Sequence, residues 1–413
     1  MSSTYLSPTA ITKEFLRILH NNLTFTSGVN KQYNSDFANS GATMSGKIGP
    51  SLRVRKPNRY TVRTGAAINV QDVTEEYATV NCTTQKGVDM RFSSADLTLT
   101  IDEFSDRYIR PAALLLASTI DFDGLALVKD VYNLTGVAGT QPGAASSGDA
   151  KSPDVFLNAG AYLSNYAVPT ENRSVVLSPF AQAAAVAGLS GLFNPTAAIS
   201  KQYNTGEMGS ALGLDFKMDQ NVNRLTCGSR VAAGESTVKG ANQTGSTILL
   251  NAVNGKTYKV GDVFSIASGA NVNTLNWETK QDTGTAQKFV VTEDALAANS
   301  EVALKIAPPI TLTGATATVS NSPDNIAAVT FIGTASTSYS QNLCYHKDAF
   351  TLVTADLVLP KGVDFAAREV YDGIACRIVR QYDISNDTLP CRLDVLYGWT
   401  TLYPQMACRI IGG

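Results

Sequence analysis

The residues of this chain that could perform catalysis are few. Only two histidines are present, His20 and His346. Cys344 and His346 lie two positions apart, so on a strand they would share one face and could form a nucleophile–base pair. The sequence shows no acid that would orient the histidine. Ser236–Lys239 (STVK) matches the S-x-x-K pattern of serine acyl-enzymes, but it lies in a glycine-flanked loop without their companion motifs. A packed or solvent-facing strand is therefore favoured over a Cys-dependent enzyme.

Other catalytic and ligand-binding patterns are missing from the sequence. It contains no phosphate-binding P-loop, no glycine fingerprint for dinucleotides, no G-x-S-x-G and no His-rich metal spacing. Asp121 and Asp123 would point about 200° apart on a helix, so they could not clamp one ion, and a salt-bridge role is expected. We predict no catalytic, cofactor or metal site, and hence a protein that is not an enzyme.

One segment has a lopsided distribution of charge. From Gly46 to Gln71 every charged residue is basic, whereas from Asp72 to Asp106 eight acids face two bases. The two halves could pair with each other in a two-stranded ribbon, or a projecting loop could lay its basic strand on an acidic patch of a neighbouring copy. The sequence leaves both open. The residues predicted for such an intersubunit contact are Arg53, Arg55, Lys56, Arg59, Arg63, Glu75 and Glu76.

Composition limits the class of protein. The 413 residues allow two or three domains, and only 16 % of them are charged. A surface of small, weakly charged residues suits repeated protein–protein contact. With a net charge of −2, the chain lacks the basic excess of a dedicated nucleic-acid binder.

The cysteines and the N-terminus indicate where the chain folds. Six cysteines are far apart, without a C-x-x-C pair, and we expect buried free thiols in a reducing compartment. The N-terminal residues lack the long apolar run of a secretory signal. Both features favour folding in a cytoplasm.

The elements that must position these residues centre on the stretch from Asp96 to Thr135. Thr100–Glu103 matches a capping box, after which a short helix should end near Ile109. Pro111 suits the first position of a second helix, which is predicted to reach Leu134.

That long helix has apolar residues on two sides, so we expect it to lie between layers. A membrane span is rejected because Asp121 and Asp123 would each cost about 2.5 kcal/mol in a bilayer. A long core helix of an ordinary α+β protein is the competing interpretation. One predicted buried face is Ala113, Leu116, Ala117, Ile120, Gly124, Leu127, Val128, Val131 and Leu134, and the other is Leu114, Leu115, Phe122, Leu125 and Tyr132.

Before this helix, the chain begins with one amphipathic helix and continues as strands. The helix is predicted over Ala10–His20, followed by a polar extended arm to residue 45. The strands predicted from alternation are Ser51–Arg55, Arg59–Val62, Tyr77–Cys82 and Val88–Phe92, with a bend at Lys86–Gly87.

After the helix, a flexible Gly/Ala/Ser loop at 136–152 precedes an α/β segment, 153–226. The α/β elements expected there are helices at Asp154–Tyr162 and Pro179–Ala187 and strands at Arg173–Leu177 and Leu214–Met218.

A separate all-β region follows, from about Cys227 to Gln341. Because α/β character resumes after it, we predict a barrel or sandwich inserted into a host fold. Its predicted strands are Thr247–Leu250, Val263–Ile266, Lys288–Thr292, Val302–Ile306 and Val329–Ile332. The predicted strands of the resumed host are Phe350–Val358, Gly373–Tyr382, Pro390–Thr400 and Tyr403–Ile411.

Three stretches resemble the major coat proteins of tailed bacteriophages, of the short-tailed Salmonella/Shigella phage type with an inserted β-barrel. Leu52–Tyr60 resembles a strand of that family that ends in a basic pair, a proline and an aromatic residue. The run from Val88–Phe92 through Leu97–Leu99 and Arg110–Ala112 to Ile120–Asp121 is similar to the family's path into a Pro-initiated spine helix. Val260–Ile266 is similar to a turn–strand unit of its insertion domain.

The resemblance implies the Johnson fold of tailed-phage and herpesvirus capsids, an α+β fold. It divides the chain into an N-arm (1–45), an extended β loop (46–95), a peripheral domain with the spine helix (96–152), an axial/peripheral α/β core (153–226 and 344–375), an inserted β-barrel (227–343) and C-terminal strands of the core (376–413). Some relatives crosslink autocatalytically through Lys and Asn, but no such set can be placed here, and crosslinking is not expected.

The resemblance also implies a function. We expect a major capsid protein that self-assembles as hexamers and pentamers into an icosahedral shell around double-stranded DNA, without sequence-specific DNA binding. A scaffolding protein and a portal are the implied assembly partners, no membrane is involved, and assembly would occur in the bacterial host's cytoplasm before the protein resides in the virion. A β-rich adhesin or fibre protein is the structural alternative, but it would require a secretion route.

Overall fold

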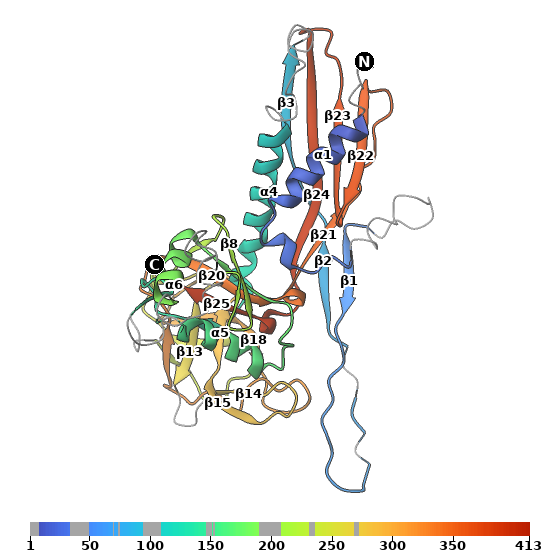
Figure 1. The fold of residues 1–413 in the computed structure, drawn as a ribbon. Coiled ribbons are helices and arrows are strands. Elements are labelled where there is room, and N and C mark those ends of the chain that lie inside the picture. Colours follow the sequence, from blue (N-terminus) through green and yellow to red (C-terminus); the bar gives the residue numbers. More distant parts are fainter. Residues whose placement is uncertain are drawn as a thin grey trace. The chain divides into compact units, whose positions relative to one another are not determined.

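The computed structural model describes residues 8–33, 49–68, 70–72, 75–93, 109–145, 151, 153–189, 208–230, 236–267 and 272–413. The chain divides into two compact units (Figure 1). The first consists of Met1–Arg55, Tyr77–Gly124 and Phe350–Leu402, and the second of Lys56–Glu76, Leu125–Ala349 and Tyr403–Gly413. The capping box predicted at Thr100–Glu103 and the short helix after it lie outside the described residues.

The first unit is built on a five-stranded antiparallel sheet. Its longest strand, β24 (Thr388–Thr401), pairs with β3 (Thr84–Ser93) along one edge. Along the other edge it pairs first with β23 (Ile374–Arg380) and then with β21 (Phe350–Ala355), while β22 (Phe365–Tyr371) lies outside β23. Three of the four strands predicted for the resumed host, Phe350–Val358, Gly373–Tyr382 and Pro390–Thr400, are thus confirmed here with shifted ends, whereas β22 was not predicted.

The bend predicted at Lys86–Gly87 is wrong, because β3 runs straight through it. Gly87 is there for a close approach: a Cβ at this position would lie 2.3 Å from the carbonyl oxygen of Leu393 on β24. Gly87 therefore allows the backbones of β3 and β24 to approach closely, and it does not mark a turn.

Two helices accompany this sheet. Helix α1 (Pro8–Asn21) packs against β22 and β23, burying Phe15 and Leu19 completely. The chain then forms the 3₁₀ turn η1 (Thr26–Gly28), where the ring of Phe25 lies 5.5 Å from that of Trp399.

Helix α4 (Arg110–Leu125) is shorter than predicted. Gly124 weakens its last turn, the 3₁₀ segment η4 (Ala126–Asp130) tightens the chain, and Leu134–Thr135 forms the strand β4. Pairing with another strand therefore overrides the helical periodicity beyond Leu125. By length and composition Arg110–Asp130 could cross a membrane, but half of it is buried in the fold, as in a core helix.

Only one of the two predicted apolar faces of α4 is buried. Ala113, Leu116 and Ile120 are at most 2 % exposed, as predicted. Burial of the second face is wrong for three of its four helical members, Leu114, Leu115 and Phe122, which are 40 %, 61 % and 49 % exposed. Its remaining members, Leu125 and Tyr132, are buried at and beyond the helix end.

The two aspartates of α4 have different roles. Asp123 forms a salt bridge with Lys86, with 2.6 Å between Oδ2 and Nζ, as expected for a helix edge. The helix-edge position predicted for Asp121 is wrong, because this residue is 1 % exposed. Its carboxylate is buried and accepts hydrogen bonds from the backbone N–H groups of Thr24, Phe25 and Thr26.

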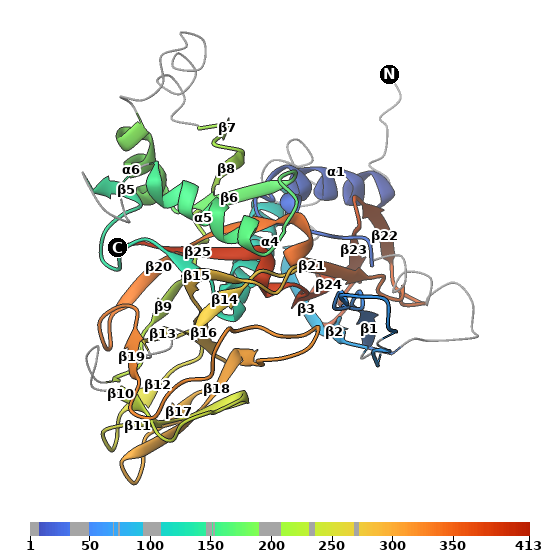
Figure 2. The ribbon, with the colours of Figure 1, turned by 90° about the horizontal axis from the view of Figure 1, so that it is seen from below.

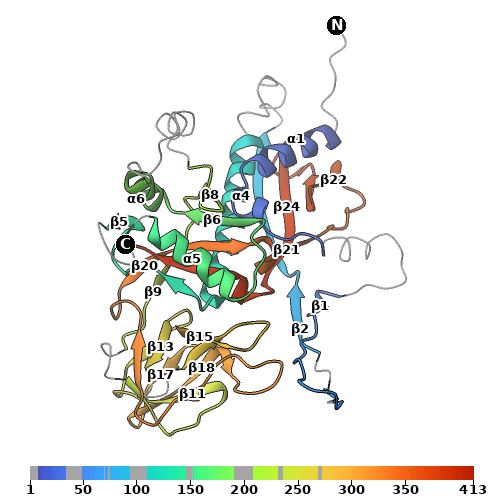
Figure 3. The same ribbon diagram turned by 60° about the horizontal axis from the view of Figure 1, so that its bottom comes forward.

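The second unit contains a mixed sheet in the order β4-β25-β20-β6-β8-β7. Figure 3 labels its strands β20, β6 and β8. Its central strands, β25 (Ala407–Ile411), β20 (Ser338–His346) and β6 (Arg173–Leu177), are almost wholly buried. Strand β8 (Leu214–Met218) pairs in parallel with β6, β7 (Ser210–Ala211) closes that edge, and β9 (Arg224–Thr226) extends β20.

Helices α5 (Asp154–Asn165) and α6 (Pro179–Leu189) belong to the same unit, and both run past their predicted ends. Phe156 of α5 packs edge-to-face on Phe216 of β8 at 5.1 Å. Within the loop predicted at 136–152, Gly143–Ala145 forms the strand β5 beside α6.

The inserted region closes into a barrel in the order β10-β11-β18-β16-β13-β19 (Figure 2). Alternate residues of its strands fill the interior, including Ile248, Phe264, Phe289 and Leu304, each 0 % exposed. The predicted α+β class with an inserted barrel is confirmed. The barrel strands are β10 (Ser236–Val238), β11 (Gly245–Asn251), β13 (Val263–Ala267), β16 (Lys288–Val291), β18 (Glu301–Ile310) and β19 (Ala328–Phe331).

Candidate functional site: the charged ribbon and the root of its loop

The charged segment begins as the predicted two-stranded ribbon. Strands β1 (Ser51–Arg55) and β2 (Tyr77–Asn81) pair antiparallel, with Arg55 opposite Tyr77. Alternation along β1 buries Val54 and leaves Arg53 and Arg55 exposed. The guanidinium of Arg53 lies 4.9 Å from the ring centre of Tyr77, at the distance of a cation–π contact. The two arginines therefore form one basic surface on the ribbon.

Beyond the ribbon, the loop 56–76 is held at its root by backbone and side-chain bonds. Lys56 N–H donates to the carbonyl of Glu76 at 2.8 Å, and the Glu76 carboxylate accepts from Arg59 at 3.3 Å. Further along, the side-chain amide of Gln71 makes two hydrogen bonds, of 2.6 and 2.8 Å, with the backbone of Thr61.

The strand predicted at Arg59–Val62 is wrong, because residues 56–64 form no strand. Pro57 removes a backbone donor, and the Gln71 side chain occupies the backbone groups of Thr61 that a partner strand would use. Alternation predicted a strand but could not supply a neighbour for it.

The seven predicted contact residues are only partly brought together. Lys56, Arg59 and Glu76 meet at the root of the loop, where they line a cavity of about 490 Å³. Arg63 instead donates to carbonyl groups of its own loop, those of Gly65 and Ala67. Arg53 and Arg55 lie on the exposed face of the ribbon, and Glu75 is exposed.

The root of the loop contains aromatic residues that the sequence reasoning missed. The Arg59 guanidinium lies 3.8 Å from the ring centre of Trp277, and the Lys56 ammonium lies 5.5 Å from that of Tyr403. Burial lowers the pKa of Lys56, and the positive charge of Arg59 adds to this effect against the opposing charge of Glu76. The sequence offered only a weak signal for these aromatic partners, namely their residue types. Trp277, for example, is one of only two tryptophans in the chain.

The loop also exposes large apolar side chains that charge patterning did not reveal. Tyr60, Val62, Ile68 and Val70 are 61 %, 98 %, 83 % and 83 % exposed. Tyr60 and Val62 are two residues apart in the sequence, as are Ile68 and Val70. This spacing was the signal from which two exposed apolar pairs could have been predicted. Clustered exposure of this kind is typical of a surface that another protein covers.

The residues considered for catalysis are not arranged for it. Cys344 and His346 are both buried in β20, and burial raises the pKa of the Cys344 thiol well above its usual range, so the thiol stays protonated. Ser236 faces Tyr258, with 3.3 Å between their hydroxyl oxygens, whereas Lys239 pairs with Glu301. A buried, protonated thiol and a lysine paired with a carboxylate do not supply an activated nucleophile and its base.

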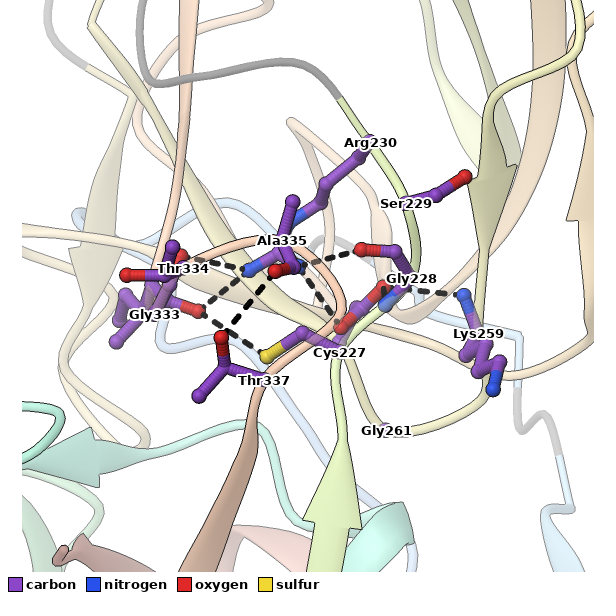
Figure 4. Close-up of polar contacts among 12 residues, drawn as sticks. Cys227, Gly228, Ser229, Arg230, Lys259, Gly261, Gly333, Thr334, Ala335 and Thr337 are labelled. Atoms are coloured by element: carbon purple, nitrogen blue, oxygen red, sulfur yellow. Dashed lines mark hydrogen bonds and ion pairs between the residues drawn. The ribbon is translucent and has the colours of Figure 1, made fainter.

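All six cysteines are free, and five of them are buried, as predicted; Cys227 is half-buried. Cys227 lies where the chain enters the inserted region, beside the strand on which the chain leaves it (Figure 4).

Buried charge concentrates at this entry point. Arg230 is 2 % exposed and donates to the carbonyls of Ile332 at 2.6 Å and Gly333 at 3.1 Å. Asp262 lies 3.5 Å from the Arg230 guanidinium, and its carboxylate also accepts from the backbone of Gly228 at 3.1 Å. The paths into and out of the barrel are thus bonded to each other through one arginine.

A second buried arginine comes from the host sheet. Arg409 of β25 donates to the carbonyl of Gly261 at 2.7 Å and to that of Lys129 at 2.8 Å. Burial lowers its pKa to about 10. Arg409 therefore links the barrel, the host sheet and η4 through hydrogen bonds to backbone oxygens.

Comparison with known proteins gave one family and a set of distant structures. The sequence profile of the family described as "P22 coat protein - gene protein 5" matches residues 4–412. No curated protein matches the chain.

Among solved structures, that of Mycobacterium phage Che8 is similar at 12 % identity and a TM-score of 0.49, over 94 % of this chain and 90 % of that one. The capsid of Ralstonia phage GP4 is similar at 8 % identity and a TM-score of 0.44, over 88 % and 84 %. The capsid of the cyanophage P-SCSP1u is similar at 12 % identity and a TM-score of 0.42, also over 88 % and 84 %.

Proposed function

This chain belongs to the P22 coat protein family, and from that premise we propose how it assembles and what it encloses. It is a major capsid protein that forms the shell of a tailed phage, with the Johnson fold and an inserted barrel, and its place is the capsid of the virion. The observation that carries this conclusion is the family match over nearly the whole chain.

The proposal covers the steps of assembly. Hexamers and pentamers of the chain would form in the bacterial host's cytoplasm with a scaffolding protein and a portal. The shell would then enclose double-stranded DNA without sequence-specific contacts. A net charge of −2 supports this, because such a shell does not hold packaged phosphates tightly. The division into N-arm, extended loop, peripheral domain, axial core, inserted barrel and C-terminal strands belongs to the same proposal.

The proposed intersubunit surface is the charged ribbon with its loop. The exposed basic pair Arg53 and Arg55 supports an electrostatic contact with acidic residues of a neighbouring copy. Val62 and Ile68, which are 98 % and 83 % exposed, support an apolar contact made by the loop. In this arrangement the charges orient the approaching subunits, and the apolar side chains supply most of the buried area.

Electron microscopy of the purified protein tests self-assembly. We expect closed icosahedral shells, or capsomers that close on co-expression with a scaffolding protein. Monodisperse monomers in all of these conditions would contradict the proposal.

Charge reversal tests the ribbon. We expect Arg53→Glu with Arg55→Glu to leave the subunit folded, by circular dichroism and urea unfolding, but to abolish shells in the same microscopy assay. Lys239→Glu, at an exposed position of the inserted region, is the control that changes charge away from the ribbon. Normal shells from the double variant would remove the ribbon from the interface while leaving the coat function intact.

A further inference from the structure

A hairpin outside the closed barrel presents Trp277 in a defined position. The hairpin consists of β14 (Asn273–Leu275) and β15 (Asp282–Ala286), and Trp277 lies in the turn between them (Figure 2). The Asn276 side chain accepts hydrogen bonds from the backbone N–H groups of Glu278 and Thr279, both at 3.0 Å. An asparagine that caps a turn in this way restricts its backbone. The indole is therefore carried on a rigid turn.

The base of the hairpin is fixed to the host fold. The Gln287 side-chain oxygen accepts from Thr274 of β14 at 3.0 Å and from the hydroxyl of Tyr166 at 3.3 Å. Tyr166 is buried, and its ring lies 6.1 Å from that of Trp277. Because these contacts join the hairpin to the residues that follow α5, the position of Trp277 is set by the host fold.

The same indole holds the root of the loop 56–76. Arg59 stacks on it at 3.8 Å and pairs at 3.3 Å with Glu76, which lies at the opposite end of the loop. The Arg59 side chain is 22 % exposed, so this contact is largely withdrawn from solvent, where a cation–π interaction is strongest. One guanidinium thus connects both ends of the loop to the inserted region.

A second cation shares the ring. The Lys280 ammonium lies 5.1 Å from the ring centre of Trp277 and donates to the carbonyl of Ala317 at 3.4 Å. Burial lowers the pKa of Lys280, and the charge of Arg59 lowers it further. The positive charges of Arg59 and Lys280 repel each other, but each is attracted to the Trp277 ring. Their positions next to each other therefore depend on the indole.

We propose that Arg59, Trp277 and Glu76 form a clamp by which the inserted region fixes the direction of the loop 56–76 in the free subunit, a role in assembly that rests on the proposed function. The loop would then be preorganised before it meets another subunit, and less conformational entropy would be lost on association. This gives the inserted region a role in addition to its own folding: it orients a loop of the host.

The clamp can be tested on unassembled subunits, independently of shell formation. A Trp399→Phe parent makes Trp277 the only tryptophan; among the described residues the Trp399 indole N–H has no hydrogen-bond partner, so the change removes no hydrogen bond. In this parent, we expect Arg59→Ala to shift the Trp277 emission. We also expect it to raise hydrogen exchange across Lys56–Glu76 about threefold to tenfold, with exchange in the barrel strands unchanged.

A second variant and a control complete the design. Trp277→Leu should raise exchange in the same loop, and combining it with Arg59→Ala should add little, since both remove one interaction. Arg63→Ala is the control, because this guanidinium is bonded to its own loop and should leave the Trp277 emission unchanged.

Unchanged loop exchange in Arg59→Ala would overturn the clamp, as would fully additive effects of the two substitutions. If Trp277→Leu disturbs the hairpin, which faster exchange in β14 and β15 would reveal, Trp277→Tyr keeps an aromatic platform. The clamp then requires loop exchange close to that of the parent, and faster exchange would overturn it.

Discussion

Asp121 shows how a single buried carboxylate can replace a local cap. One oxygen accepts from Thr24 N–H at 2.7 Å and the other from Thr26 N–H at 2.9 Å and its hydroxyl at 2.5 Å. These N–H groups begin the short turn η1, whose own sequence provides no side-chain cap. An aspartate nearly 100 residues away performs that task.

Substitution of Asp121 should therefore lower the free energy of unfolding more than substitution of an ordinary helix residue would. In Asp121→Asn one acceptor oxygen becomes a donor facing N–H groups, and we expect the free energy of unfolding to fall by about 2–4 kcal/mol. The matched control is Asp123→Asn, which weakens the partly exposed pair with Lys86 but keeps an amide oxygen that can accept from the Tyr397 hydroxyl, and it should cost about 1 kcal/mol or less. Urea unfolding of the unassembled subunit measures both, and equal losses would contradict the special role of Asp121.

His346 should make stability depend on pH. Burial in β20 lowers its pKa below the usual value of 6.5, so the unfolded chain binds a proton more readily than the folded chain. Stability is then full above about pH 6.5 and falls with decreasing pH until the folded-state pKa is reached. His346→Asn keeps a side-chain acceptor near the Asp348 N–H and removes the titration. Between pH 7 and 5 its unfolding free energy should vary less than that of the parent, and an unchanged slope would refute the assignment.

At the scale of elements, helix α4 is shaped by what packs on it. A Cβ at Gly124 would lie 2.7 Å from the Trp399 ring and 2.9 Å from that of Phe25. Alanine normally favours a helix over glycine by about 1 kcal/mol, but here the overlap should reverse the sign and destabilise the subunit by about 1–3 kcal/mol.

Gly160 in the interior of α5 is the matched control for that substitution. Nothing lies within 4 Å of the position that its Cβ would take. Gly160→Ala should therefore stabilise the protein by about 0.5–1 kcal/mol in the same unfolding assay. A gain from Gly124→Ala as well would show that α4 can move away from Phe25 and Trp399.

These elements also show what the sequence could predict. Strands β6 and β8 have their predicted ends because local pattern defines both: β6 contains the apolar run Val175–Leu177, and β8 alternates apolar with charged residues. The burial of Leu115 and Phe122 was mispredicted because periodicity reports apolarity and not the presence of a second layer. The partners of Asp121 and Arg59 were beyond prediction, since hydrogen bonds and ring contacts across long sequence separations depend on the tertiary fold.

At the scale of the molecule, the inserted barrel is joined to its host by buried charges. Arg230 bonds the entering chain to the leaving chain, and Arg409 bonds the host sheet to the barrel turn at Gly261. Asp262 is the carboxylate that balances Arg230. Buried pairs of this kind add little net stability, but losing one partner leaves an uncompensated charge.

Asp262→Ala should therefore weaken the whole barrel and not only its entry point. It leaves Arg230 without a carboxylate and removes the acceptor for Gly228 N–H and Lys259 N–H, and we expect a loss of about 3–5 kcal/mol. Hydrogen exchange should rise together in β11, β13 and β18. Adding Arg230→Met removes the stranded charge, so the double variant should recover part of the loss in urea unfolding. If the double variant is less stable than Asp262→Ala alone, Arg230 holds the two chain segments together through its carbonyl bonds, and the ion pair is secondary.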